Sequence, residues 1–272
     1  MRSLLLGILL VALSQYGFAQ TKQMTLFSIA ELEEQPTIWT VDKQQNFIYL
    51  ANSTLYKCDS SGKKRFTQSI KELGEIKQIL PVNAMKIIVF SEEQQRICVL
   101  DNTLSINGKC KDLTKYGISQ ATFVAVSDRS NMIWVLDQLN MTVYLIDIVQ
   151  DKVQQKVRNF NGINRSKSSI VGLAEHNNQL FLWDEKGTIF ECDNLLNLKK
   201  TSNEHLLPIQ FSGQFFVEQD KDKLRFYRSA DHEQRIIASP EKNAVGFQIE
   251  GNDFYFLLDK KIAHYRFKSF NY

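Results

Sequence analysis

The sequence predicts an all-β fold: a six-bladed β-propeller with four-stranded blades, its ring closed by an N-terminal strand that completes the last blade. Three observations support this prediction: a repeat of about 42 residues, the β-branched and aromatic content of its apolar runs, and a spare strand near the N-terminus. A period of this length is typical of propeller blades.

Each repeat contains an apolar run, a polar break and a second apolar run. The second runs end at Asp59, Asp101, Asp147, Asp193, Ser229 and Phe267, so successive ends are 42, 46, 46, 36 and 38 residues apart. Further apolar runs, such as 38–41 before the first pair and 153–157 after the third, supply the remaining strands of four-stranded units. A seven-bladed ring with one degenerate unit is the alternative.

Helical repeats do not fit the apolar runs. Most are four to six residues long, and none sustains a period of 3.6 residues. The one helical turn that we expect lies at 69–74, between the first two units.

The two ends of the chain complement each other. The sixth unit ends at Tyr272 without an outer strand, whereas Met24–Ala30 is a strand candidate with no unit of its own. If this strand completes the last blade, the ring is closed by chain pairing and no open edge remains.

The first 19 residues have the pattern of a cleaved signal peptide. Met1-Arg2 gives a positive start, 4–13 is an apolar run, and Gly17-Phe18-Ala19 is a small-x-small cleavage site. Ten apolar residues are too few to span a bilayer, which takes about 20. We therefore expect residues 20–272 to form one exported propeller domain, periplasmic or secreted.

The remaining composition excludes several classes of partner. No later segment is long and apolar enough for a membrane span. The formal net charge is only +3, with no concentrated basic segment, so we expect no nucleic-acid partner. The oligomeric state is not fixed by the sequence.

The four cysteines divide into two kinds. Cys98 and Cys110 flank a polar segment that we interpret as a hairpin turn, so a disulfide across adjacent strands is possible, although the sequence leaves open whether it forms. Cys58 and Cys192 occupy matching places in two units and are interpreted as buried small hydrophobic residues.

The repeat resembles a known superfamily. The ending Tyr144-Leu145-Ile146-Asp147, followed by a polar turn, is similar to repeats of the NHL and YVTN-like propellers. The likeness extends over nearly all of residues 20–272 and implies the fold but no particular function. The chain departs from NHL repeats in having few glycines in its turns, and it lacks the YWTD tetrapeptide.

No catalytic or metal-binding constellation is evident in the sequence, and we expect no cofactor. Histidines are not paired at zinc-ligand spacing; His264 fits a structural strand position, and His205 is the one histidine expected at a channel mouth. The aspartates that end the repeats are interpreted as turn residues rather than calcium ligands, because an aspartate can accept hydrogen bonds from the backbone two residues later. The three tryptophans are interpreted as packing between blades.

The best candidate for a contact surface is the segment 160–169, which is rich in Asn and Ser. Long loops on a rigid scaffold commonly carry binding residues. We therefore select Asn161, Asn164, Arg165 and Lys167 as candidate binding residues, together with His205.

The leading functional hypothesis is a non-catalytic propeller of the bacterial cell envelope that binds another envelope protein. One alternative is a metal-dependent, lactonase-like hydrolase, which would require three or four inward carboxylate, amide or histidine groups at one mouth of the channel. A second alternative is a carbohydrate-binding propeller, which would show equivalent exposed aromatic residues in several blades.

Overall fold

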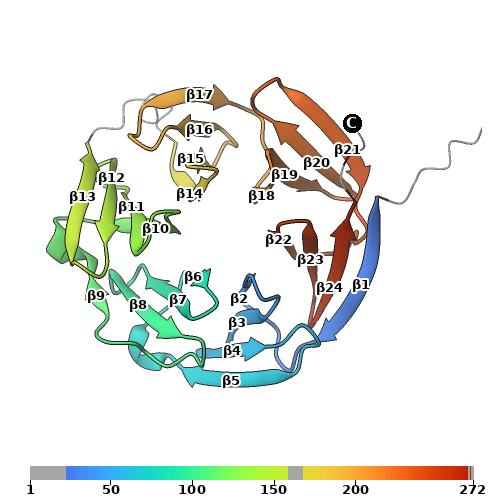
Figure 1. Ribbon diagram of the computed structural model, residues 1–272, viewed down its shortest axis with the longest axis horizontal. Helices are drawn as coiled ribbons and strands as arrows, with labels where there is room; N and C mark the ends of the chain where they lie inside the picture. Colours follow the sequence, from blue (N-terminus) through green and yellow to red (C-terminus); the bar gives the residue numbers. More distant parts are fainter. Residues whose placement is uncertain (1–22, 159–167, 269, 271–272) are drawn as a thin grey trace, which may run out of the picture.

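The computed structural model describes residues 23–158, 168–268 and 270, which form a closed ring of six β-sheets (Figure 1). Each sheet has four antiparallel strands arranged from the channel outward. The prediction of a six-bladed propeller is confirmed, and the seven-bladed alternative is wrong. The expected cleavage site and residues 1–19 lie outside the described residues.

The blades are numbered in chain order, with the strand nearest the channel named first. Blade 1 contains β2 (Ile38–Val41), β3 (Phe47–Ala51), β4 (Thr54–Cys58) and β5 (Lys64–Ser69). Blade 2 contains β6 (Gln78–Asn83), β7 (Lys86–Ser91), β8 (Arg96–Asp101) and β9 (Lys111–Asp112). Blade 3 contains β10 (Ala121–Val126), β11 (Met132–Asp137), β12 (Thr142–Asp147) and β13 (Lys152–Val157).

Blade 4 contains β14 (Ile170–His176), β15 (Gln179–Asp184), β16 (Ile189–Cys192) and β17 (Leu198–Ser202). Blade 5 contains β18 (Gln210–Ser212), β19 (Phe215–Asp220), β20 (Lys223–Arg228) and β21 (Glu233–Ala238). Blade 6 contains β22 (Gly246–Glu250), β23 (Asp253–Leu258), β24 (Lys261–Phe267) and, as its outer strand, β1 (Met24–Glu31). Two 3-10 turns, η1 (Lys71–Leu73) and η2 (Leu113–Tyr116), precede blades 2 and 3; η1 is the helical turn predicted at 69–74.

The ring closes where the sequence predicts. Strand β1 pairs antiparallel with β24, in a register that runs from Met24 opposite Phe267 to Glu31 opposite Lys261. The blue and red ends of the ribbon therefore share one blade (Figure 1). Removing β1 would leave the hydrogen-bonding edge of β24 unpaired, so β1 is integral to blade 6.

Burial within a blade follows from its position in the ring. The middle strands are covered on both faces by neighbouring blades, so β3 and β12 are buried throughout and have continuous apolar runs instead of alternation. The outer strands β5 and β13 lie at the rim, where the blades diverge, and are largely exposed or half-buried. The inner strands face the channel, and this edge positions the candidate site.

The hydrophobic core is divided among the seams between adjacent blades. Five seams bury ten or more apolar side chains each in the described residues. The seam between blades 4 and 5 has a smaller core: Phe181, Ile189, Ile209, Phe216 and Tyr227. Polar contacts supplement the core there, as described below.

The repeated aspartates are turn residues, as predicted. In blade 4, the Asp193 Oδ1 accepts hydrogen bonds from the backbone N–H groups of Leu195 and Asn197, at 2.9 and 2.8 Å. Asp59, Asp101 and Asp147 make the same kind of contact with the backbone two residues later. The side-chain amide and backbone N–H of Asn197 hold the pKa of Asp193 down at about 2.

The cysteines differ in state. Cys98 and Cys110 form a disulfide with a Cα–Cα distance of 4.3 Å, and it ties the end of the loop between β8 and β9 to β8. Cys58 and Cys192 are buried free thiols, and burial raises the pKa of Cys58 to about 11 and of Cys192 to about 12. The helical turns in the described part of the chain are too short to cross a bilayer.

Candidate functional site

The inner strands of all six blades surround a central channel of about 740 Å³. Its wall is mostly apolar, with Ile38, Leu80, Pro81, Val126, Val171 and Leu207 among the lining residues. Aromatic rings come from three different blades: Trp39 on β2, Trp183 on β15 and Phe211 on β18. A concave apolar cavity with a few polar groups has the character of a small-molecule site.

The position of Trp183 depends on a glycine. Trp183 lies on the second strand of blade 4, where its register partner on the inner strand is Gly172. A Cβ atom added at Gly172 would lie 1.9 Å from Cε2 of the indole ring. Because position 172 has no side chain, the indole lies across the inner strand and reaches the channel.

Few charged groups line the channel. The Lys77 ammonium group forms an ion pair with Glu92 and lies 4.1 Å from the centroid of the Phe123 ring. Glu175, near the end of β14, accepts a hydrogen bond at Oε2 from the Trp134 indole N–H. Its other oxygen, Oε1, is buried without a hydrogen-bond partner among the described residues.

The polar residue Gln78 contributes to the wall in a different way. Its amide oxygen accepts from the Val124 N–H at 2.8 Å, and its amide nitrogen donates to the Val124 carbonyl at 3.0 Å. The side chain thus joins the inner strands of blades 2 and 3 and has a structural role.

A lactonase-like metal site would require three or four inward carboxylate, amide or histidine groups on the channel wall. Glu175 is the one carboxylate on the described wall of the channel. Within the described ranges, no cluster of three His, Cys, Asp or Glu side chains could hold a metal ion. The wall also carries the amides of Gln78, Gln210 and Gln248, and the Gln78 amide is engaged with the Val124 backbone.

One face of the ring carries a second candidate site. Neighbouring strands are antiparallel, so the turns that join the first and second strands of each blade lie on one face. The turns that join the third and fourth strands of blades 1–5 lie on the same face. We call it the disulfide face, since the loop that ends at Cys110 belongs to it. Three of its turns expose a large apolar side chain by more than 60%: Met85 at 63%, Val149 at 64% and Leu195 at 64%.

A groove of about 460 Å³ lies on the disulfide face between blades 2 and 3. Its lining combines apolar Val149 and Ile148 with four lysines, Lys86, Lys109, Lys111 and Lys115, and two aspartates, Asp112 and Asp151. Lys111 is paired with Asp151 at 2.8 Å. The groove is therefore apolar in part and has an excess of positive charge.

Cross-blade contacts hold this face together. Lys86 Nζ donates to Asn131 Oδ1 at 2.9 Å, which links blades 2 and 3. Arg129 Nη2 donates to the Asn194 carbonyl at 3.1 Å, which links blades 3 and 4. These two contacts tie the turns next to Met85 and Leu195 to neighbouring blades, and the Lys111–Asp151 pair does the same for the turn that carries Val149.

The structure places His205 away from the channel wall. Its side chain is buried, Nδ1 contacts Glu218 Oε1, and Nε2 lies 3.0 Å from Ser202 Oγ. The expectation of a histidine at the channel mouth does not agree with this position, because both ring nitrogens are used inside the seam between blades 4 and 5. The other candidate binding residues, Asn161, Asn164, Arg165 and Lys167, lie outside the described residues.

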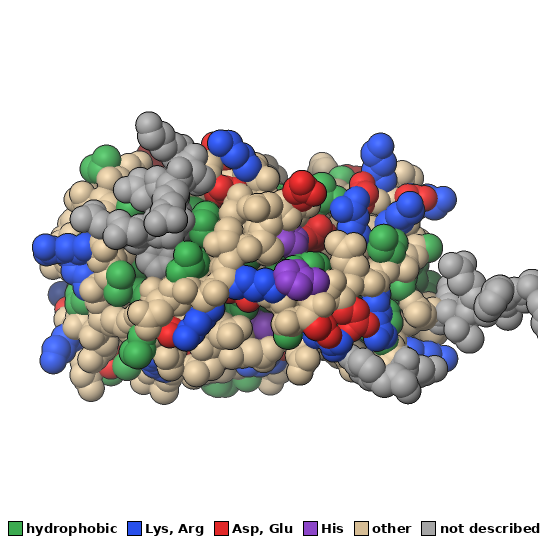
Figure 2. Space-filling view, turned by 90° about the horizontal axis from the view of Figure 1, so that it is seen from above, with side chains coloured by type: hydrophobic (Ala, Val, Ile, Leu, Met, Phe, Trp, Pro, Cys, Tyr) green, Lys and Arg blue, Asp and Glu red, His purple; other side chains and the backbone are tan. Residues whose placement is uncertain are grey.

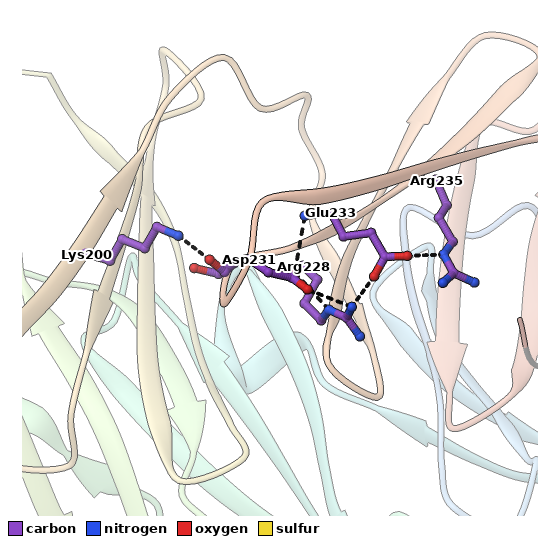
Figure 3. A network of polar contacts seen from close by, with 6 residues as sticks. Lys200, Arg228, Asp231, Glu233 and Arg235 are labelled. Carbon is purple, nitrogen blue, oxygen red and sulfur yellow. Dashed lines mark hydrogen bonds and ion pairs between the residues drawn. The ribbon is translucent and has the colours of Figure 1, made fainter. Parts of the chain in front are cut away.

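The same seam carries a polar network on its outer side (Figure 3). Lys200 of β17 donates to the backbone carbonyl of Ser229, across the seam. In blade 5, Arg228 contacts Asp231 at 2.8 Å and also Glu233, which in turn contacts Arg235. The charges satisfy one another, which indicates a structural network at the seam with the smallest apolar core.

Positive and negative side chains are mixed on the outer edge of the ring. Figure 2 looks at the ring edge-on and shows Lys and Arg side chains interspersed with Asp and Glu, with hydrophobic side chains between them. This side therefore has no extended field of one sign.

Sequence reasoning missed the channel residues. Glu175 and Gly172 lie in an inner strand whose apolar run carries no motif, and only the ring geometry brings them beside residues of other blades. The tryptophans were expected to pack between blades; Trp134 does so, whereas Trp39 and Trp183 are half-buried and also line the channel.

Comparisons with known proteins support the fold but no particular function. No protein-family model matches the sequence, and no curated protein does. The WD40 domain of Pan2 from Neurospora crassa is 10% identical with a TM-score of 0.62, covering 91% of this chain and 96% of that domain. The BBS1N chain solved in complex with ARL6DN is 13% identical with a TM-score of 0.57, covering 86% of this chain and 78% of that one.

An enzyme is also among the similar structures. Virginiamycin B lyase from Staphylococcus aureus is 13% identical with a TM-score of 0.56, covering 85% of this chain and 80% of the lyase. Propellers of such different kinds share the fold alone at this level of identity.

Proposed function

We propose that the mature chain is a non-catalytic, exported propeller of the bacterial cell envelope that binds another protein through its disulfide face. The observation that carries this proposal is the exposure of the apolar side chains Met85, Val149 and Leu195 on the turns of three successive blades, with Val149 lining a lysine-rich groove. Exposed apolar residues rimmed by polar ones are typical of protein interaction sites.

Rigidity supports this assignment. The cross-blade contacts of Lys86, Arg129 and Lys111 hold the turns in place before a partner binds, and the disulfide holds the loop that lines the groove. A surface that is already ordered loses less conformational entropy on binding. The described turns of blades 1, 5 and 6 on the same face expose no large apolar side chain, so these exposed residues are confined to blades 2–4.

The chemistry of the groove indicates the kind of partner. Four lysines against two aspartates favour a segment that carries acidic side chains next to an apolar one. Among similar folds, the BBS1N chain was solved in complex with another protein.

Export is part of the proposal and is supported by the sequence. The positive start, the apolar run at 4–13 and the Gly17-Phe18-Ala19 site have the order of a secretory signal. A disulfide is also more common in an oxidising compartment.

The test is capture of partners from envelope extract with the tagged mature chain and two matched variants. Val149→Asp changes the disulfide face, and Leu139→Asp changes a side chain of similar exposure (68%) on the opposite face. We expect one stoichiometric partner that is retained by Leu139→Asp and lost with Val149→Asp. Equal retention by both variants, or no reproducible partner, would contradict the proposal.

A further inference from the structure

We propose that the central channel is a binding site for a flat, apolar organic cation. This inference goes beyond the proposed protein-binding function and uses a different part of the molecule. It rests on three features of the channel: its aromatic wall, one carboxylate that has no cationic partner, and a glycine that admits an indole ring.

The aromatic wall favours a flat ligand. Trp39, Trp183 and Phe211 come from blades 1, 4 and 5 and line one cavity of about 740 Å³. This volume lies within the range of about 300–1,000 Å³ that is usual for small-molecule sites. Aromatic faces carry partial negative charge, so they attract cations as well as apolar rings.

The carboxylate of Glu175 favours a positively charged ligand. No lysine, arginine or histidine among the described residues forms an ion pair with it. Its one hydrogen bond in the described structure comes from the Trp134 indole, and its second oxygen is buried without a partner. Glu175 itself is half-buried and has no cationic partner in the described structure, so a cation in the channel would be stabilised by its carboxylate.

The other charge on the wall does not cancel this preference. The Lys77 ammonium group is engaged with Glu92 and with the face of Phe123. The channel is therefore left with an excess of one negative charge, in surroundings where water is partly excluded and charge interactions are stronger.

Gly172 fixes the aromatic part of the site. Any Cβ at this position would overlap the indole of Trp183, so Gly172→Ala must displace the ring. This variant changes the shape of the wall and leaves its charge unchanged. Glu175→Gln does the reverse, because the glutamine oxygen can still accept from the Trp134 N–H.

The probes are two dyes with the same xanthene ring system and opposite charge: rhodamine 6G, a cation, and fluorescein, an anion. Binding to purified mature protein is measured by dye anisotropy and, independently, by quenching of tryptophan emission, since Trp39 and Trp183 line the channel. We expect saturable binding of rhodamine 6G and at least tenfold weaker binding of fluorescein.

The variants separate channel binding from adsorption elsewhere. Glu175→Gln and Gly172→Ala should each weaken rhodamine 6G binding by about tenfold, the effect of one lost charge or stacking contact. Glu72→Gln, which removes an exposed carboxylate on η1, should leave binding unchanged. Thermal melting verifies that each variant is folded, and Trp183→Leu replaces Gly172→Ala if the latter is not.

Three results would overturn the inference. They are an absence of rhodamine 6G binding, equal affinity for the two dyes, and equal effects of Glu175→Gln and Glu72→Gln. None of them bears on the protein-binding proposal, whose variants lie on the turns of the disulfide face and the face opposite.

Discussion

Removal of the Cys98–Cys110 disulfide is the perturbation whose effect can be calculated most directly from the structure. The two residues are 12 apart in sequence and join β8 to the end of the loop before β9. In the chain-entropy model, a cross-link that closes a loop of about 13 residues stabilises the fold by about 3 kcal/mol, because it restricts the unfolded chain. The double variant Cys98→Ala/Cys110→Ala should therefore lose about 3 kcal/mol of unfolding free energy.

The assay is urea unfolding followed by tryptophan fluorescence, with thermal melting in parallel. For a chain of this size, about 1 kcal/mol corresponds to about 2–4 °C, so the melting temperature should fall by about 6–12 °C. Wild-type protein treated with a reductant should show a similar loss. The same reductant should have no effect on the double variant.

A change of less than about 0.5 kcal/mol, the usual size of a neutral surface substitution, would refute this reasoning. So would a reductant effect that persists in the double variant. Either result would mean that the loop between β8 and β9 is not constrained by the disulfide in solution.

Three further predictions test the ring, the thiols and the turns. Ala30→Arg places a charge at a buried position of β1 and should lower the unfolding free energy by about 3–5 kcal/mol, whereas Thr25→Glu, at an exposed position of the same strand, should change it little in urea titrations. Cys58 and Cys192 should not react with a thiol reagent at pH 8 in the native protein, because burial raises their pKa values to about 11 and 12. Both should react in denaturant. Labelling of the native protein would contradict the described burial. The pKa of Asp193 is about 2 in the folded protein and near 4 in the unfolded chain. The stabilisation by the ionised carboxylate is therefore complete above pH 4 and is lost as the pH falls towards 2. The difference in unfolding free energy between wild type and Asp193→Asn should therefore shift against the wild type from pH 4 to pH 2, and a constant difference would contradict the hydrogen-bonded turn.

The fold could be predicted from the sequence because its determinants are local. The middle strands β3 and β12 are buried on both faces and leave continuous apolar runs, and the aspartates that end the repeats make hydrogen bonds within their own turns. The strand that begins at Met24 has no unit of its own, and the last unit has no outer strand. Their pairing, which the structure shows, could therefore be predicted from the sequence.

The candidate sites could be predicted only in part, because they are assembled across blades. Glu175 gains its significance from Trp134, 41 residues earlier, and the wall of the channel takes residues from all six blades. The partner of His205, Glu218, lies on the next blade, and nothing in the local sequence indicates that the pair is buried. A single sequence gives the spacing of such residues along the chain but not their distances around the ring.

The measurement that tests the proposed function most directly is site-specific photo-crosslinking in living cells. A photoreactive phenylalanine analogue is placed at Val149 or Leu195 on the disulfide face, and at Leu139 or Val245 on the opposite face, all four of which are exposed. The proposal predicts one discrete crosslinked partner from both positions on the disulfide face and none from the two control positions. Crosslinks from the opposite face alone, or no discrete product at any position, would contradict a protein-binding role for the disulfide face.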